Sequence, residues 1–321
     1  MTDQLHLAVA LDGYGWHRQA WRTTLSRDPE AGSVLSGTYW ADLATTAETG
    51  LLDFLCIDDA LTPQPGRRPQ LSPGRLVGRC DAVLTAARVA PGTRHIGLMP
   101  VATVTHTDAS RVAAAIATLD VVSHGRAGWQ TRVSSSAHEA ALFGRHDFPA
   151  GRDLFDEATD FVAKVRARWD GRPVVSALAH AQRVYEFASA ATDLVFVTPR
   201  DDADLRDIVA AITTLPGPTP LVYADAVVTF GGDTDFGSDA AIVDAAPPQV
   251  AEMILRWHDL GVDGVRLRPA VHATDLPVIA DEVVPLLQAT GRFRVAYRDG
   301  ETLRARLGLP VPDNRYAEVI P

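Results

Sequence analysis

Short apolar, β-branched runs alternate with amphipathic segments from one end of the chain to the other. The runs have the length of buried parallel strands, and the segments between them repeat apolar positions with the period of a helix. Strands are expected at 5–10, 52–57, 95–99, 127–133, 173–177, 194–197, 221–228 and 262–267. Helices are expected at 40–50, 75–89, 108–122, 152–169, 181–191, 201–214, 247–260 and 275–289. Eight strands separated by helices predict an α/β fold, a (βα)8 TIM barrel, as a single domain over 1–321.

A doubly wound sheet is the competing α/β architecture, and its usual mark is a glycine-rich first turn. Gly13-Tyr14-Gly15 begins like that fingerprint, but Arg18 stands where the third glycine belongs. The barrel therefore remains the better prediction.

Three stretches are too long or irregular to be simple connections: 12–39, 58–74 and 229–246. In a barrel, the loops after the strands build the site, so the second and third stretches are expected to be pocket walls or lids. For 229–246, which is polar, glycine-rich and acidic, an unstructured surface loop is the open alternative.

Composition excludes several classes of protein. The 30 basic and 40 acidic side chains give a net charge of −10 without a basic block, so neither nucleic acid nor an anionic membrane is an expected partner. No apolar run is long enough to span a membrane, and no secretory signal is visible, so a cytoplasmic location is expected. Cys56 and Cys80 make no disulfide framework. Lys164 is the only lysine and lies in a helical pattern, which excludes Schiff-base catalysis.

The chemistry of a barrel is decided by the side chains that follow its strands. Here these are Asp58, Asp59, Thr103, His106, Gln130, Arg132, His180, Thr198, Arg266 and Arg268. They include no His-x-His pair, no ring of carboxylates and no pair of acids across a bond, so neither a metal site nor a glycosidase is expected. A borrowed organic cofactor is the economical hypothesis.

Three long motifs carry a family resemblance: GLLDFLCIDDAL (50–61), TLDVVSHGRAGWQTRVSS (118–135) and TLRARLGLPVPDNRYA (302–317). They resemble the bacterial-luciferase-like flavin monooxygenases, in the branch of the nitrilotriacetate, dibenzothiophene-sulfone and long-chain alkane enzymes. The resemblance implies a luciferase-like TIM barrel and a two-component FMN-dependent monooxygenase. It also implies that a separate flavin reductase supplies reduced FMN, that O2 oxygenates a small organic substrate, and that the chain forms a homodimer or heterodimer.

The resemblance also assigns residues by position. Asp59, preceded by Asp58, corresponds to the acid beside the flavin ring, Thr103 to a Ser or Thr under the ring, and Gln130 to an Asn after the tryptophan. His106 is the histidine best suited to a catalytic proton or substrate role near neutral pH.

The flavin phosphate is where the chain departs from the family pattern. The branch has a glycine- and serine-containing segment after the fifth strand, and 177–184 here has neither glycines nor serine. Ala179 and His180 are the cofactor-binding candidates in this segment, where His180 or Arg183 would hold a phosphate by charge. Segments that the family inserts between the elements of the barrel are also shorter in this chain. Two alternatives therefore stay open, a cofactor-poor paralogue acting as the partner subunit of a luciferase-like heterodimer, and a deazaflavin-dependent oxidoreductase.

Overall fold

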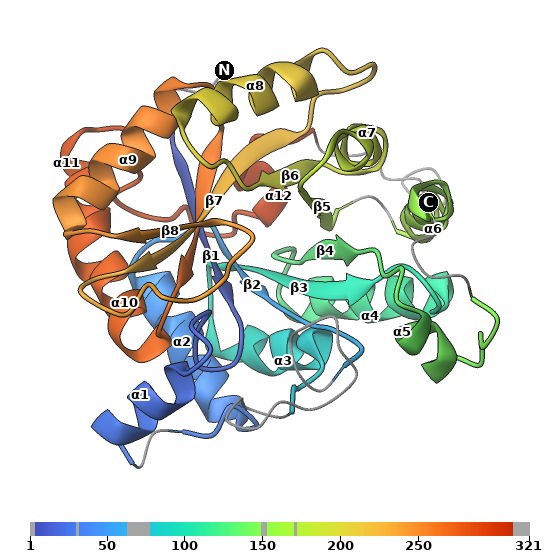
Figure 1. Ribbon diagram of the computed structural model, residues 1–321, viewed down its shortest axis with the longest axis horizontal. Coiled ribbons are helices and arrows are strands. Elements are labelled where there is room, and N and C mark those ends of the chain that lie inside the picture. Colours follow the sequence, from blue (N-terminus) through green and yellow to red (C-terminus); the bar gives the residue numbers. More distant parts are fainter. Residues whose placement is uncertain (1–3, 30–31, 63–77, 149–152, 170–171, 311–321) are drawn as a thin grey trace, which may run out of the picture.

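A closed barrel of parallel strands forms the centre of the protein (Figure 1). The computed structural model describes residues 4–29, 32–62, 78–148, 153–169 and 172–310. Within these residues the barrel strands are β1(His6–Leu11), β2(Phe54–Ile57), β3(Gly97–Thr103), β4(Gly128–Arg132), β5(Val174–Ala179), β6(Leu194–Val197), β7(Leu221–Thr229) and β9(Gly264–Pro269). They pair in chain order, and β7 pairs with β6 while β9 pairs with β1, which closes the ring. The predicted (βα)8 TIM barrel is confirmed.

Helices surround the ring, and each predicted helix has a counterpart (Figure 1). They are α2(Gly37–Thr49), α3(Ala82–Val89), α4(Ala109–Val122), α6(Phe155–Arg166), α7(Gln182–Ala191), α8(Asp202–Thr213), α9(Pro247–Asp259), α10(His272–Val278) and α11(Val284–Ala289). A π-helical turn, Ile279–Val283, joins the last two. Pro277 and Pro285 flank this region, and each lacks the N–H that a regular α-helix would use.

Three α-helices, one strand and a short 3₁₀ turn were not expected from the sequence: α1(Ala20–Arg27), α5(Ala137–Leu142), α12(Leu303–Arg306), β8(Ala241–Asp244) and the turn Ala90–Gly92. The β8 strand lies within 229–246 and pairs with the carboxyl-terminal half of β7, beyond the part that β6 covers. This stretch is therefore held beside the barrel mouth rather than left as an unstructured loop. Most of the predicted wall at 58–74 lies outside the described residues.

The barrel lumen is packed separately from the layer between strands and helices. Phe54, Met99 and Phe196 fill its amino-terminal half, and Leu303 of α12 and Leu307, directly after that helix, close it from below. Gly97 at the start of β3 is needed there. An added Cβ would lie 2.7 Å from Leu303 Cδ1 and 2.8 Å from Phe54 Cβ. We call α12 with Leu307 the lumen plug.

A buried acid joins three segments at this amino-terminal end. Asp53 accepts hydrogen bonds from the Leu7 amide at 2.8 Å, from His6 Nδ1 at 3.0 Å and from Arg294. Despite burial, the charges of Arg294 and His6 hold the pKa of Asp53 well below its ordinary range. In this fold, polar clusters at the amino-terminal face contribute stability rather than catalysis.

Two expectations from composition can be checked directly. Cys56 and Cys80 are free thiols. Among the described helices, none combines the length and the apolar character that crossing a membrane requires.

Candidate functional site

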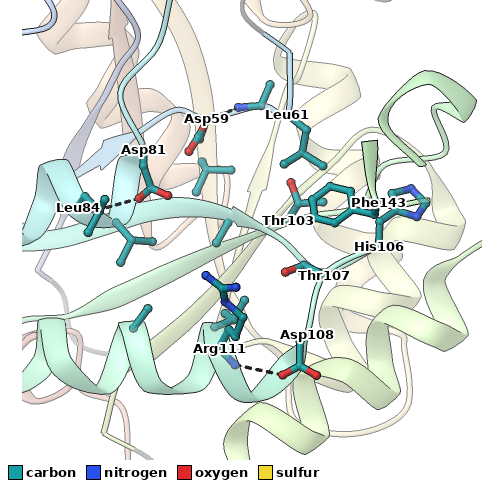
Figure 2. A pocket seen from close by; sticks show the side chains of 16 residues that line it. Asp59, Leu61, Asp81, Leu84, Thr103, His106, Thr107, Asp108, Arg111 and Phe143 are labelled. Atoms are coloured by element: carbon teal, nitrogen blue, oxygen red, sulfur yellow. Dashed lines mark hydrogen bonds between the residues drawn. The ribbon is translucent and has the colours of Figure 1, made fainter. Parts of the chain in front are cut away.

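A groove of about 730 Å³ opens at the carboxyl ends of β2 and β3, between α3 and α4 (Figure 2). We call it the β2–β3 groove. Much of its wall is apolar, and three predicted site residues, Asp59, Thr103 and His106, lie in this one cavity. Its other polar lining residues are Asp81, Thr107, Asp108 and Arg111. Figure 2 also shows Arg111 of α4 directing its guanidinium into the groove.

The Asp59 carboxylate is held in one orientation at the edge of this groove. Its Oδ1 accepts from the Ala60 amide at 2.7 Å, and its Oδ2 accepts from the Ala82 amide, at the start of α3, at 3.0 Å. Burial raises the pKa of Asp59, and these two amides act in the opposite direction. The carboxylate is thus a fixed acceptor that needs no reorganisation when a ligand binds.

Near Asp59, two further aspartates, Asp12 and Asp58, pair with the same arginine, Arg79. Arg79 Nη2 is 2.6 Å from Asp12 Oδ2, and Arg79 Nη1 is 3.2 Å from Asp58 Oδ2. Arg79 Nε is buried without a hydrogen-bond partner among the described residues. Burial, with the charges of Asp58 and Asp59, raises the pKa of Asp12 to about 7. Sequence reasoning overlooked Asp12, which comes two residues after the expected strand at 5–10 and directly after the observed β1.

This raised pKa predicts a pH dependence of stability. Between the ordinary pKa of an aspartate and about 7, the folded chain holds a proton on Asp12 that the unfolded chain has lost. The free energy of unfolding should therefore fall as pH rises from about 5 to 8, and Asp12→Asn should remove that part of the slope. Urea denaturation of both chains at several pH values measures it. Equal slopes would contradict the prediction.

Thr103 is positioned by Arg132, a residue of the neighbouring strand β4 that forms an ion pair with Glu139 of α5. Arg132 makes a two-point salt bridge to Glu139, at 2.7 and 2.9 Å, and its Nη1 also donates to Thr103 Oγ1 at 3.3 Å. Because Thr103 is the acceptor in that bond, its hydroxyl proton is not used there and can be donated toward the groove.

His106 has both ring nitrogens engaged. Its Nε2 lies 3.0 Å from the Ser134 carbonyl oxygen, and its Nδ1 lies 3.0 Å from Arg145 Nη1. These partners fit a neutral ring that donates from Nε2 and accepts at Nδ1. Burial and the Arg145 charge lower the pKa of His106. The backbone φ of 69° is left-handed, which is uncommon outside glycine. A proton-transfer role for His106 would require one of these bonds to break.

Gln130 lies in the barrel lumen rather than in the groove. Its Oε1 accepts from Arg266 Nη1 at 2.6 Å, and Arg266 Nε donates to Asp225 Oδ1 at 2.8 Å. Arg268 Nε donates to the same carboxylate, at Oδ2, at 2.9 Å. We call Gln130, Asp225, Arg266 and Arg268 the lumen cluster. It fills the centre of the barrel below the mouth, and the guanidinium of Arg266 lies 3.4 Å from the centre of the Phe196 ring.

The segment after β5 holds the last two candidates apart from the groove. Ala179 is buried in the layer between barrel and helices. His180 Nδ1 lies 2.8 Å from Thr198 Oγ1, and its Nε2 lies 3.5 Å from Asp239 Oδ2. Arg183, in the first turn of α7, pairs with Asp153 and Asp156. Carboxylates therefore engage both side chains that were considered for the flavin phosphate, and burial lowers the pKa of His180.

No group of three or more His, Cys, Asp or Glu side chains within the described ranges is arranged to hold a metal ion. Of the predicted site residues, Asp59, Thr103 and His106 therefore lie together in the groove, with Asp58 near them, while Gln130 lies in the lumen, Ala179 in the layer between barrel and helices, and His180 beside Asp239.

A closed (βα)8 barrel with its polar groups at the carboxyl ends of the strands defines the class of TIM-barrel enzymes. Residues 21–214 match the family model described as luciferase-like monooxygenase, and the chain belongs to this family of flavin-dependent monooxygenases.

Individual relatives agree with this assignment. The chain is 23% identical to N-acetyl-S-(2-succino)cysteine monooxygenase of Bacillus subtilis (strain 168), over 98% of this chain and 99% of the relative. It is 30% identical to nitrilotriacetate monooxygenase component A of Aminobacter aminovorans, over 52% of this chain but only 38% of that relative. The fold is similar to that of EDTA monooxygenase from Chelativorans sp. BNC1, with a TM-score of 0.81 and 19% sequence identity. The match covers 96% of this chain and 99% of that protein.

The first of these alignments also bears on the shortened insertions. It extends over 444 positions, whereas this chain has 321 residues. The Bacillus protein therefore carries segments that have no counterpart here.

Proposed function

We propose that this chain is the oxygenase component of a two-component FMN-dependent monooxygenase. It would take reduced FMN from a separate flavin reductase and use O2 to oxygenate a small organic substrate. Family membership supports this proposal, as does a relative named component A. The observation that carries it is the β2–β3 groove, where Asp59 and Thr103 present fixed polar groups between apolar walls.

The residues of the groove fit a flavin ring. A ring of that size needs a largely apolar cavity and a few polar partners, and a groove of about 730 Å³ with Asp59 and Thr103 among its lining residues is consistent with both needs. In the described structure acids engage His180 and Arg183, so the segment after β5 presents no free cation to the phosphate. Phosphate binding there would require one of these acids to be displaced.

A bound reduced flavin supplies the electrons that activate O2. The chain's own residues orient and protect it. Asp59 would accept from an N–H at the ligand's polar edge, and Thr103 would donate to a neighbouring oxygen or nitrogen. Leu61, Val101 and Phe143 line the groove and would shield the bound ring from water.

Two substitutions test this placement. Asp59→Ala and Thr103→Val should each raise the Kd for reduced FMN by about tenfold, since each removes one hydrogen bond worth about 1 kcal/mol or more. An anaerobic fluorescence titration with reduced FMN measures it.

The control accounts for loss of a helix cap, because Asp59 also binds an amide at the start of α3. Asp201 caps α8, outside the groove, by accepting from the Asp204 amide at 2.8 Å. Asp201→Ala should leave the Kd unchanged. Unaltered binding in Asp59→Ala and Thr103→Val would place the flavin outside this groove.

The engaged cations after β5 favour a second candidate, a cofactor-poor partner subunit of a luciferase-like heterodimer. That function predicts no binding of reduced FMN by the chain alone and co-purification with a larger homologue. Saturable binding by a homodimer would exclude it.

A further inference from the structure

The end of β9 places a buried arginine at the barrel mouth. The Arg268 side chain is 1% exposed, donates two hydrogen bonds to Asp225, and lies 4.6 Å from the centre of the Trp16 ring. Its remaining terminal nitrogen, Nη1, donates to Asp239 Oδ1 at 2.6 Å. Arg268 is thus the member of the lumen cluster that faces the mouth.

The lumen cluster has one positive charge more than it has negative charges. Arg266 and Arg268 share the single carboxylate of Asp225, and Gln130 is neutral. A buried charge without a counter-charge is strongly unfavourable, so the second guanidinium requires an anion from outside the cluster. In the described structure Asp239 provides it.

Asp239 differs from the cluster in its position. It belongs to the stretch between β7 and β8, and its side chain is 40% exposed. Asp233, from the same stretch, lies 3.3 Å from His17 Nε2, and the Phe236 ring packs edge-on against His17. A surface segment therefore inserts one carboxylate against a prebuilt cationic position.

A histidine lies on the other side of the same carboxylate. His180 Nε2 is 3.5 Å from Asp239 Oδ2, farther than the 2.6 Å hydrogen bond from Arg268 Nη1, so the carboxylate lies between the two side chains. A guanidinium and an imidazole that face the two oxygens of one group are suited to a carboxylate or a phosphate group.

We propose that Arg268 and His180 form a binding site for a small oxyanion, and that Asp239 occupies this site until a ligand replaces it. The ligand chemistry is a carboxylate or a phosphate group, carried either by an anionic substrate or by the flavin. Only the identity of that ligand rests on the proposed function.

Asp239→Asn tests the site with sulfate as the probe, at constant ionic strength set with sodium chloride. The variant should bind sulfate saturably and at least about tenfold more tightly than the unmodified chain, measured by calorimetry and by the rise in Tm. Asp235→Asn, which removes an exposed charge from the same stretch, should bind no better than the unmodified chain. His180→Gln added to Asp239→Asn should reverse part of the gain.

An equal gain in Asp235→Asn, or no gain in Asp239→Asn, would overturn the proposal. If Asp239→Asn does not fold in sulfate-free buffer, added sulfate should restore its folding transition, and failure to do so would overturn it as well. These measurements contain no flavin, so a failure of flavin binding leaves their result unchanged.

Two further titrations of Asp239→Asn distinguish the sources of the anion. If the site takes the flavin phosphate, reduced FMN should bind about tenfold more tightly than reduced riboflavin, and sulfate should compete with it. If the site takes a substrate carboxylate, the two flavins should bind alike, and succinate should compete with sulfate instead.

Discussion

Asp225→Asn should lower the free energy of unfolding by about 3–5 kcal/mol, the usual cost of removing one partner from a buried ion pair. The carboxylate is fully buried and is the shared acceptor of Arg266 and Arg268. Asparagine keeps the size of the side chain but leaves two guanidinium groups without their common counter-charge. Urea denaturation at neutral pH measures the loss.

The control for this substitution is Asp207→Asn, which removes the same charge from an exposed position on α8. A surface change of this kind should stay within about 0.5 kcal/mol. If Asp225→Asn were equally mild, the lumen cluster would not depend on its ion pairs.

Asp53→Asn should cause a comparable loss of about 3–5 kcal/mol at the opposite end of the barrel. Asp53 accepts from the Leu7 amide and pairs with His6 and Arg294, so it ties β1 and the segment after α11 to the start of β2.

The pH profile identifies the origin of this loss. The pKa of Asp53 is lower in the folded chain, so its contribution is complete above the pKa of the unfolded chain, about 4. It declines as pH falls toward the folded pKa. The difference in the free energy of unfolding between the unmodified chain and Asp53→Asn should therefore be present at neutral pH and shrink below pH 4. A difference that persists unchanged at pH 3 would contradict the assignment.

Hydrophobic periodicity was sufficient to predict the barrel, because each barrel strand and each main helix buries a regular apolar face. The elements it missed depend on tertiary contacts. The lumen plug has one helical turn, and it is held because Leu303 and Leu307 enter the lumen. The β8 strand has four residues that are mostly half-exposed, and only the free half of β7 makes it a strand.

The groove residues were predictable to the extent that they follow strands. Asp59 and Thr103 do so, and both line one cavity. The partner of Gln130 was not predictable, because its bond to Arg266 joins β4 to β9 across the lumen. No local pattern indicates which side chains meet there. Asp239 was overlooked for a related reason, because its partner Arg268 belongs to a different strand and its charge is left unbalanced by the lumen cluster.

The lumen plug has a consequence for the order of events during synthesis. His6 of β1 pairs with Gly264 of β9, and Leu303 packs in the lumen in the same cluster as Phe54 of β2. Segments from opposite ends of the chain must therefore meet before the barrel is complete. The ring therefore stays open, with unpaired strand edges, until almost the whole described chain has left the ribosome. Open edges of this kind pair readily with other chains, and contacts between distant residues form slowly. Nascent chains and fragments that end before α12 should thus be aggregation-prone, so productive expression should depend on chaperone capacity more than on the final stability of the barrel.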